Sequence, residues 1–221
     1  GPDIIDEILR DNAAKQLVAA KFIATKLWEF LAHPQPQPAL VDELAGVFVG
    51  AGMELRPLVR AILLHPEFYS SQSRQGLLRS PAEWIVAVLI HSGLTATATR
   101  AFDWSILMGQ RVFDPPNVAG WKNNDYYLST AAVSARASWA RRVADLMRAN
   151  GGFDSLGSMA SGDAVDSVAD FFGIAPLAAT TRQVLIDAYD AEKTAVGGSV
   201  ARAITNLLTL TMLTGEMNAP C

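Results

Sequence analysis

Several kinds of residue and motif that indicate a particular chemistry are scarce or missing in this chain. Its 221 residues include one cysteine and three histidines. Because Cys221 has no second cysteine to pair with, an intrachain disulfide framework is excluded. No two histidines have the close spacing of a metal-binding helix, so we expect no metal site and no cofactor. Phosphate-binding Gly-rich loops and the Gly-x-Ser-x-Gly nucleophile elbow are also missing, so the sequence assigns no catalytic residue.

The net charge is also small, and the apolar runs are short. The formal net charge is -4, and neither sign forms a long run, so the basic footprint of a nucleic-acid-binding protein is missing. No apolar stretch approaches the roughly 18 to 20 residues that a membrane-spanning helix needs. Half of the residues are nevertheless hydrophobic, and the mean hydropathy is +0.20. This composition predicts a globular protein with a large core.

The dominant pattern along the chain is helical. In residues 13–32, apolar side chains recur at three- and four-residue intervals, which is typical of one face of a helix. Among them are Leu17, Ala20, Ala24, Leu27 and Leu31. Alternation of apolar and polar residues with a period of two is nowhere sustained. The sequence therefore predicts an all-α bundle of about nine helices. The expected helices are 13–32, 38–51, 55–65, 81–91, 97–108, 127–149, 163–173, 181–194 and 199–214.

Composition also suggests a division of the chain. Residues 151–162 are rich in Gly, Ser and Asp and predict a flexible linker. A main helical domain over 3–150 would precede it, and C-terminal helices over 163–221 would follow and pack on that domain. Gly1-Pro2 resembles the remnant of a cleaved expression tag, so we expect a fragment of a longer protein.

The most informative segment is the loop Phe113–Trp121, which separates two expected helices. Pro115 and Pro116 each fix a backbone dihedral angle. Asn117 can bond the local backbone, and Gly120 permits a tight turn before Trp121. Such a loop is expected to be rigid. It could present polar and aromatic groups to a ligand at a low entropic cost.

Seven residues in or near this loop are candidates for binding. They are Arg111, Asp114, Asn117, Trp121, Tyr126, Tyr127 and Arg136. An arginine can bind a carboxylate through two hydrogen bonds, but Arg136 could equally hold the loop closed by bonding its carbonyls. Likewise, Trp121 and Phe113 could fill the core, in which case the loop is only a structural connector.

Two other groups of residues have ordinary structural explanations. Asp163, Asp166 and Asp170 share one helical face, and a solvated acidic face is favoured over a calcium or magnesium site. Trp28, Trp84 and Trp139 lie on apolar helical faces and are expected in the core, whereas Trp104 and Trp121 are better candidates for the surface.

Five segments, taken in order, resemble a known family. They are Lys21–Phe30, Leu55–Tyr69, Ser80–Trp84, Met108–Trp121 and Ala135–Ala140. Together they resemble the C-terminal half of the bacterial domain-of-unknown-function family 1800, over about residues 3–145. The Pro-Pro-Asn-Val-x-Gly-Trp loop is the most specific element. His65 departs from the serine that is more usual in the family before Pro-Glu-Phe.

The resemblance implies a long, mostly helical bacterial protein, commonly exported to the periplasm or beyond. Such proteins are often encoded beside an exported sulfatase-like companion, which would be a possible partner, as would the N-terminal half of the same protein. The resemblance implies no activity.

Three functions stay open at this point. The preferred hypothesis is a binding or assembly module that recognises a partner protein or a glycan through residues 110–127. The first alternative is a hydrolytic enzyme whose cleft requires the absent N-terminal half, and buried carboxylates beside the loop would favour it. The second is a structural scaffold that completes the core of the full-length protein, and exposed apolar patches along residues 4–31 would support it.

Overall fold

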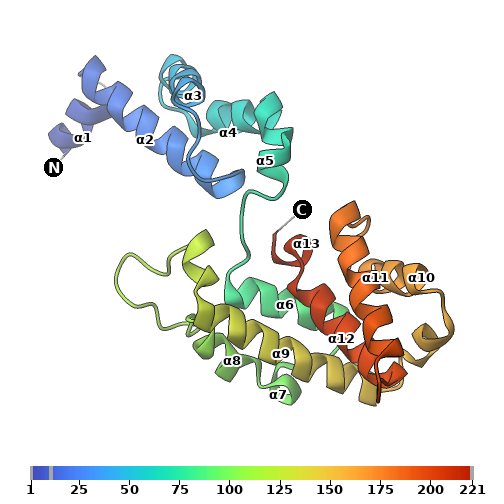
Figure 1. The fold of residues 1–221 in the computed structure, drawn as a ribbon. Coiled ribbons are helices and arrows are strands. Elements are labelled where there is room, and N and C mark those ends of the chain that lie inside the picture. The colour runs from blue at the N-terminus through green and yellow to red at the C-terminus, as the bar shows by residue number, and fades with distance from the viewer. Residues whose placement is uncertain (1, 10–11, 220–221) are drawn as a thin grey trace. The chain divides into compact units, whose positions relative to one another are not determined.

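Helices make up all of the regular structure in the part of the chain that is described (Figure 1). The computed structural model describes residues 2–9 and 12–219, and Cys221 lies outside them. Within these ranges there are thirteen α-helices and three short 3₁₀ helices, and no strand. Ten of the α-helices have at least seven residues. The predicted all-α class is confirmed, with short helices in addition to the nine expected.

The helices group into two compact units, the first of which ends at Leu77 while the second begins at Leu78. This boundary lies at a different place in the chain from the linker expected over 151–162. Residues 151–162, expected as a flexible linker, contain the 3₁₀ helix η3 (Asp154–Ser158) and bury Leu156. The helices after 162 pack with α9 (Thr130–Ala149) in the second unit, because α12 (Val200–Leu213) lies against it.

The first unit contains the helices of residues 2–77. They are α1 (Pro2–Leu9), α2 (Ala13–Leu31), α3 (Pro38–Gly50), α4 (Leu55–Leu64), η1 (Pro66–Tyr69) and α5 (Ser71–Arg74). The side chain of Asn12 caps α2 by accepting from the amides of Ala14 and Lys15. A proline begins α3, where its missing amide hydrogen costs nothing.

Trp28 is the centre of the first unit. It is fully buried, with Leu44, Leu58 and Ile62 in the same apolar cluster. These residues come from α2, α3 and α4, so one tryptophan side chain joins the apolar faces of all three helices. A buried aromatic side chain contributes a large apolar area to such a core.

The second unit contains the helices after residue 77. Besides α9 and α12, they are α6 (Pro81–Ser92), α7 (Ala96–Thr99), α8 (Ala101–Leu107), η2 (Asn124–Leu128), η3 (Asp154–Ser158), α10 (Ser161–Phe171), α11 (Ala179–Thr194) and α13 (Gly215–Asn218). The helix expected over 97–108 is divided, because Arg100 adopts a left-handed conformation with φ of 56°. The capping box predicted at Ser80 and Glu83 is present and begins α6.

Trp84 and Trp139 form the centre of the second unit, and both are fully buried. Their rings lie 5.2 Å apart. The indole nitrogen of Trp84 donates to the carbonyl of Met212 at 3.0 Å, and that of Trp139 donates to the carbonyl of Thr99 at 3.1 Å. Both carbonyls belong to last turns of helices, where no amide within the helix can reach them. The core positions predicted for these tryptophans are confirmed.

Arg136 is buried in α9, and only 3% of it is exposed. Its guanidinium lies 5.4 Å from the Trp84 ring, donates to the carbonyl of Arg79 at 2.8 Å and also donates to the side chain of Asn218. Burial lowers the pKa of this guanidinium. Arg136 is thus a structural residue that holds the segment before α6 and helix α13 against α9.

Replacing Arg136 should therefore destabilise the second unit. In Arg136→Ala, two acceptors lose a charged donor and the Trp84 ring loses its stacked guanidinium, so we expect the free energy of unfolding to fall by about 2 to 4 kcal/mol. Urea unfolding followed by circular dichroism would measure this. Arg141→Ala, an exposed position on the same helix, is the control and should cost less than about 1 kcal/mol. Equal effects would mean that the desolvation cost of the buried charge cancels its hydrogen bonds.

Candidate functional site in the loop between α8 and η2

The Pro-Pro loop is built from three tight turns in the backbone. Gly109 and Gly120 adopt positive φ angles of 93° and 84°, a region that glycine enters without steric cost. Phe113 also has a positive φ, 67°, which is unusual for a bulky residue. Asn117 closes the last turn, because its side-chain oxygen accepts from the amide of Ala119 at 2.9 Å and its carbonyl accepts from the amide of Gly120 at 3.0 Å. This is the local bonding that the sequence predicted for Asn117.

Both ends of the loop are fixed to one short segment, Leu78–Ala82. At the start of the loop, the buried side chain of Gln110 accepts from the amide of Ala82 at 2.8 Å. At the end, the side chain of Asn124 accepts from the amide of Leu78 at 3.1 Å. The loop is consequently anchored at two points to the segment that Arg136 holds in place.

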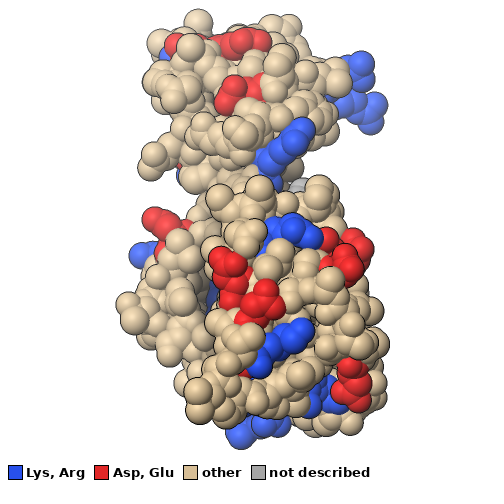
Figure 2. Space-filling view, turned by 45° about the vertical axis from the view of Figure 1, so that its right-hand side comes forward, with Lys and Arg blue, Asp and Glu red and all other residues tan. Residues whose placement is uncertain are grey.

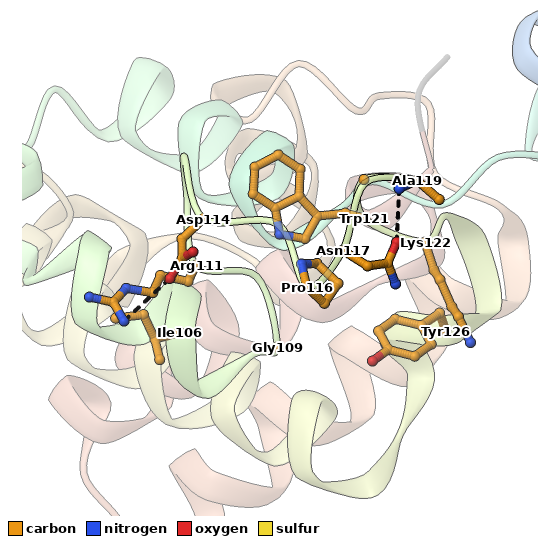
Figure 3. A pocket seen from close by; sticks show the side chains of 11 residues that line it. Ile106, Gly109, Arg111, Asp114, Pro116, Asn117, Ala119, Trp121, Lys122 and Tyr126 are labelled. Carbon is orange, nitrogen blue, oxygen red and sulfur yellow. Dashed lines mark hydrogen bonds and ion pairs between the residues drawn. The ribbon is translucent and has the colours of Figure 1, made fainter.

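The loop encloses a cleft of about 440 Å³, called the loop cleft below (Figure 3). It is lined by Ile106, Gly109, Arg111, Asp114, Pro116, Asn117, Ala119, Gly120, Trp121, Lys122 and Tyr126. In Figure 3 the Trp121 ring lies between Arg111 and Asp114 on one side and Lys122 and Tyr126 on the other. The lining therefore combines aromatic rings with charged and amide groups.

The charged groups of the loop cleft are loosely paired. The guanidinium of Arg111 and the carboxylate of Asp114 lie 3.4 Å apart, with 60% and 66% of their side chains exposed. The ammonium of Lys122 lies 5.0 Å from the centre of the Tyr126 ring, a cation–π contact. Exposed ion pairs contribute little to stability, so these groups are available to bind a ligand.

The large apolar residues of the loop divide into two kinds. Trp121 is half-buried and lines the loop cleft. Phe113 is 94% exposed, and neither it nor the exposed Val118 lines the cleft. Phe113 therefore does not fill the core, contrary to the interpretation of this loop as a connector whose aromatic side chains are buried.

Five of the seven candidate residues are brought together by the fold. Arg111, Asp114, Asn117, Trp121 and Tyr126 line the loop cleft. The two others do not line it, because their side chains are turned into the core of the second unit. These are Tyr127 and Arg136, which are 1% and 3% exposed.

Two residues of the cleft were missed by the analysis of the sequence. Ile106 belongs to the last turn of α8, and Lys122 directly follows Trp121. An isolated lysine or isoleucine carries no motif. For Lys122, the one indication in the sequence is its position between the two aromatic candidates Trp121 and Tyr126.

Tyr127 is the buried neighbour of the cleft. Its ring meets that of Tyr126 edge to face at 5.2 Å, and its hydroxyl has no hydrogen-bond partner. Burial, and to a smaller extent Tyr126 and Glu83, raise the pKa of this hydroxyl. Burial therefore favours the neutral form of this hydroxyl.

Metal ligands do not gather anywhere in the described residues. No group of three or more His, Cys, Asp or Glu side chains in residues 2–9 and 12–219 is arranged to hold a metal ion. Of the three aspartates on α10, Asp166 forms a two-point ion pair with Arg182, at 2.7 Å for each contact. This hydrogen bonding lowers the pKa of the Asp166 carboxyl. Acidic and basic side chains are interspersed on the face that Figure 2 shows.

A second polar cavity, of about 260 Å³, lies in the first unit. It is lined by His33, Gln37, Ala39, Leu40, Glu43, His65, Glu67 and Gln72. The rings of His33 and His65 each meet Trp28 edge to face, at 5.5 and 5.9 Å. His65 accepts from the amide of Glu67, so it caps the 3₁₀ helix η1. The sequence placed these histidines only at helix ends and did not indicate that they share a cavity.

Comparison with known proteins identifies the family. The profile described as "Protein of unknown function (DUF1800)" matches residues 3–218. The chain belongs to the DUF1800 family. The match extends well beyond the resemblance noted over residues 3–145 and includes the C-terminal helices. Searches of curated proteins and of solved structures give no match. No helix in the described part of this DUF1800 chain is both long enough and apolar enough to cross a membrane.

The buried hydroxyl of Tyr127 gives a prediction about stability at high pH. Because its pKa is raised in the folded state, the proton is lost first in the unfolded state, so stability should fall as the pH rises above about 10. Tyr127→Phe should reduce this fall and should be neutral or slightly stabilising at pH 7, since no hydrogen bond is lost. Chemical unfolding at pH 7 and pH 10.5 would measure both effects.

Tyr126→Phe is the matched control. Half of Tyr126 is exposed, so this variant should retain the alkaline fall of the parent protein. A loss of several kcal/mol at pH 7 in Tyr127→Phe would contradict the prediction. It would indicate that the hydroxyl has a bonded partner.

Proposed function

We propose that this DUF1800 protein is a recognition module that binds a partner protein or a glycan in the loop cleft. The observation that supports this is the lining of the cleft, in which Trp121, Tyr126, Arg111, Asp114 and Asn117 meet on a loop anchored at both ends. Its volume lies within the range of about 300 to 1,000 Å³ that is usual for ligand sites. Because the backbone is fixed in advance, little conformational entropy would be lost on binding.

The groups in the cleft favour recognition over hydrolysis. Hydrolysis by acid–base catalysis requires a positioned group whose pKa is tuned, usually by burial. Asp114 is the one carboxylate among the described residues that line the cleft, and it is exposed and paired with Arg111. This is the environment of a binding group.

The role of Trp121 can be tested directly. Trp121→Ala should remove the larger aromatic ring of the cleft, so the affinity for any ligand found on a glycan array or in a peptide library should fall at least about tenfold. Because Trp121 is only half-buried, cooperative unfolding should persist. The measurements are titration calorimetry and thermal unfolding.

Phe113→Ala is the matched control, since Phe113 is an exposed aromatic residue of the same loop outside the cleft. It should leave binding unchanged. If Phe113→Ala abolishes binding and Trp121→Ala does not, the outer side of the loop is the recognition surface. If Trp121→Ala abolishes cooperative unfolding, the loop is architectural.

A cellular setting is part of the proposal. We place the protein outside the bacterial cytoplasm, in the periplasm or the extracellular space. An exported sulfatase-like companion is the first protein partner to test against the loop cleft. Both proposals rest on what the resemblance to the DUF1800 family implies, and the family model itself matches residues 3–218.

A second candidate function, that of a scaffold, is favoured by one observation in the first unit. Many large apolar side chains of α1 and α2 are exposed. They are Ile4, Ile5, Ile8, Leu17, Val18, Phe22 and Phe30. Around Val18 and Phe22 they border an apolar groove of about 510 Å³. An exposed apolar face of this kind usually marks an interaction surface. The proposed occupant is the N-terminal half of the same protein.

If this apolar face is a scaffold surface, a substitution on it should weaken binding of the partner without changing the stability of the protein. Val18 is 70% exposed, so Val18→Asp should change the free energy of unfolding by no more than about 0.5 kcal/mol. The same change should abolish binding of a separately expressed N-terminal half in a pull-down assay. Leu64→Asp, at an exposed apolar position on α4, should leave that binding intact. Equal capture by the parent protein and Val18→Asp would exclude the scaffold role for this face.

A further inference from the structure

The polar groups of the loop cleft contain more donors than acceptors. The side-chain oxygen of Asn117 accepts from the amide of Ala119, and the NH₂ group of this cleft-lining side chain supplies two donors for a ligand. Arg111 makes one contact of 3.4 Å with Asp114, so most of its five N–H donors stay available. Lys122 contributes a third donor group, whose described contact is with the Tyr126 ring. A ligand that fits must therefore bring acceptors.

The net charge of the groups that line the cleft also favours a ligand with acceptor groups, in particular a negatively charged one. Two cations, Arg111 and Lys122, line it together with one carboxylate, that of Asp114. Asp114 can offset one of them, and it lies next to Arg111. The cation of Lys122 lies on the other side of Trp121, beside Tyr126 (Figure 3). A single negative charge on the ligand would balance the site.

The rings between these groups determine the shape of the ligand. Trp121 and Tyr126 line the cleft with Pro116, so part of the wall is apolar and flat. The C–H face of a sugar ring can pack on such a surface while its hydroxyl groups reach donors at the edge. Donor groups arranged on both sides of Trp121 suit a ring with acceptors around its edge.

We infer that the loop cleft binds a carboxylated saccharide, with the sugar ring against Trp121 and the carboxylate near Lys122. This inference rests on the proposed recognition function and specifies the ligand class. Arg111 and Asn117 would donate to the hydroxyl and ring oxygens. Asp114 would accept from a sugar hydroxyl while it keeps its contact with Arg111.

Titration of the full 221-residue chain with two matched probes would test this. One probe is a trimer of α-1,4-linked galacturonic acid, and the other is the same trimer with every carboxylate methyl-esterified. The acid should bind at least about tenfold more tightly than the ester, since the ester cannot form the charge-assisted hydrogen bond. Lys122→Gln should lower the affinity for the acid by about tenfold, so that the difference in affinity between the acid and the ester is lost.

Lys193→Gln is the matched control variant. Its ammonium also lies over a tyrosine ring, 4.9 Å from that of Tyr189, but outside the cleft. It should bind both probes as the parent protein does. If Lys193→Gln and Lys122→Gln weaken binding of the acid equally, the attraction is general electrostatics and the inference is wrong.

The remaining outcomes separate this inference from the proposed function. Equal affinity for the acid and the ester, lost in Trp121→Ala, would overturn the charge requirement and leave recognition in the cleft standing. Binding of an acidic peptide such as hexaglutamate, with no binding of either trimer, would overturn the saccharide class and favour a protein partner. If Trp121→Ala changes the binding of no glycan and no peptide, both the inference and the proposed function fail.

Discussion

The second unit depends on the hydrogen bonds of one short segment, Leu78–Ala82. The carbonyl of Arg79 accepts from Arg136 of α9, and the amide and guanidinium of Arg79 donate to the carbonyls of Asn218 and Met217 at 2.7 Å each. The same segment binds both ends of the Pro-Pro loop. Residues 78–80 lie outside any helix and Ala82 lies in the first turn of α6, so their backbone groups have no partner within a helix, and these bonds to side chains and helix ends supply partners. They also determine where the loop lies.

The two central tryptophans act in a similar way. Each buries a large apolar surface, and each indole nitrogen donates to a carbonyl in the last turn of another helix. Trp84 thereby joins α6 to α12, and Trp139 joins α9 to α7. Since an unbonded indole nitrogen would be costly in the core, these contacts restrict the relative positions of the helices more than apolar packing would. The loop cleft is supported by this fixed frame.

Two arginine side chains of the second unit differ in whether their donors are used within the structure. Arg136 is buried and uses its donors on Arg79 and Asn218, whereas Arg111 is exposed and makes one long contact. Both arginines were candidates for the same site. The two arginines differ in burial, so Arg136 is held within the structure, whereas Arg111 is exposed at the loop cleft.

The sequence by itself determined the helical class, most of the helix positions, the capping box at Ser80 and the burial of Trp28, Trp84 and Trp139. These depend on local periodicity, on proline and on short-range capping, all of which can be read within a few residues. It also indicated the rigid loop, because the dihedral limits of proline are local.

Only the tertiary structure decided which candidates meet in a cleft. Tyr126 and Tyr127 are neighbours in sequence, yet one lines the cleft and the other is buried, because the 3₁₀ helix η2 points them in different directions. The division at Leu77, the burial of Leu156 and the role of Arg136 likewise depend on contacts between residues far apart in sequence. Helical periodicity indicates the apolar face of one long helix, but in loops and short helices burial depends on which elements pack together, and no local pattern determines that.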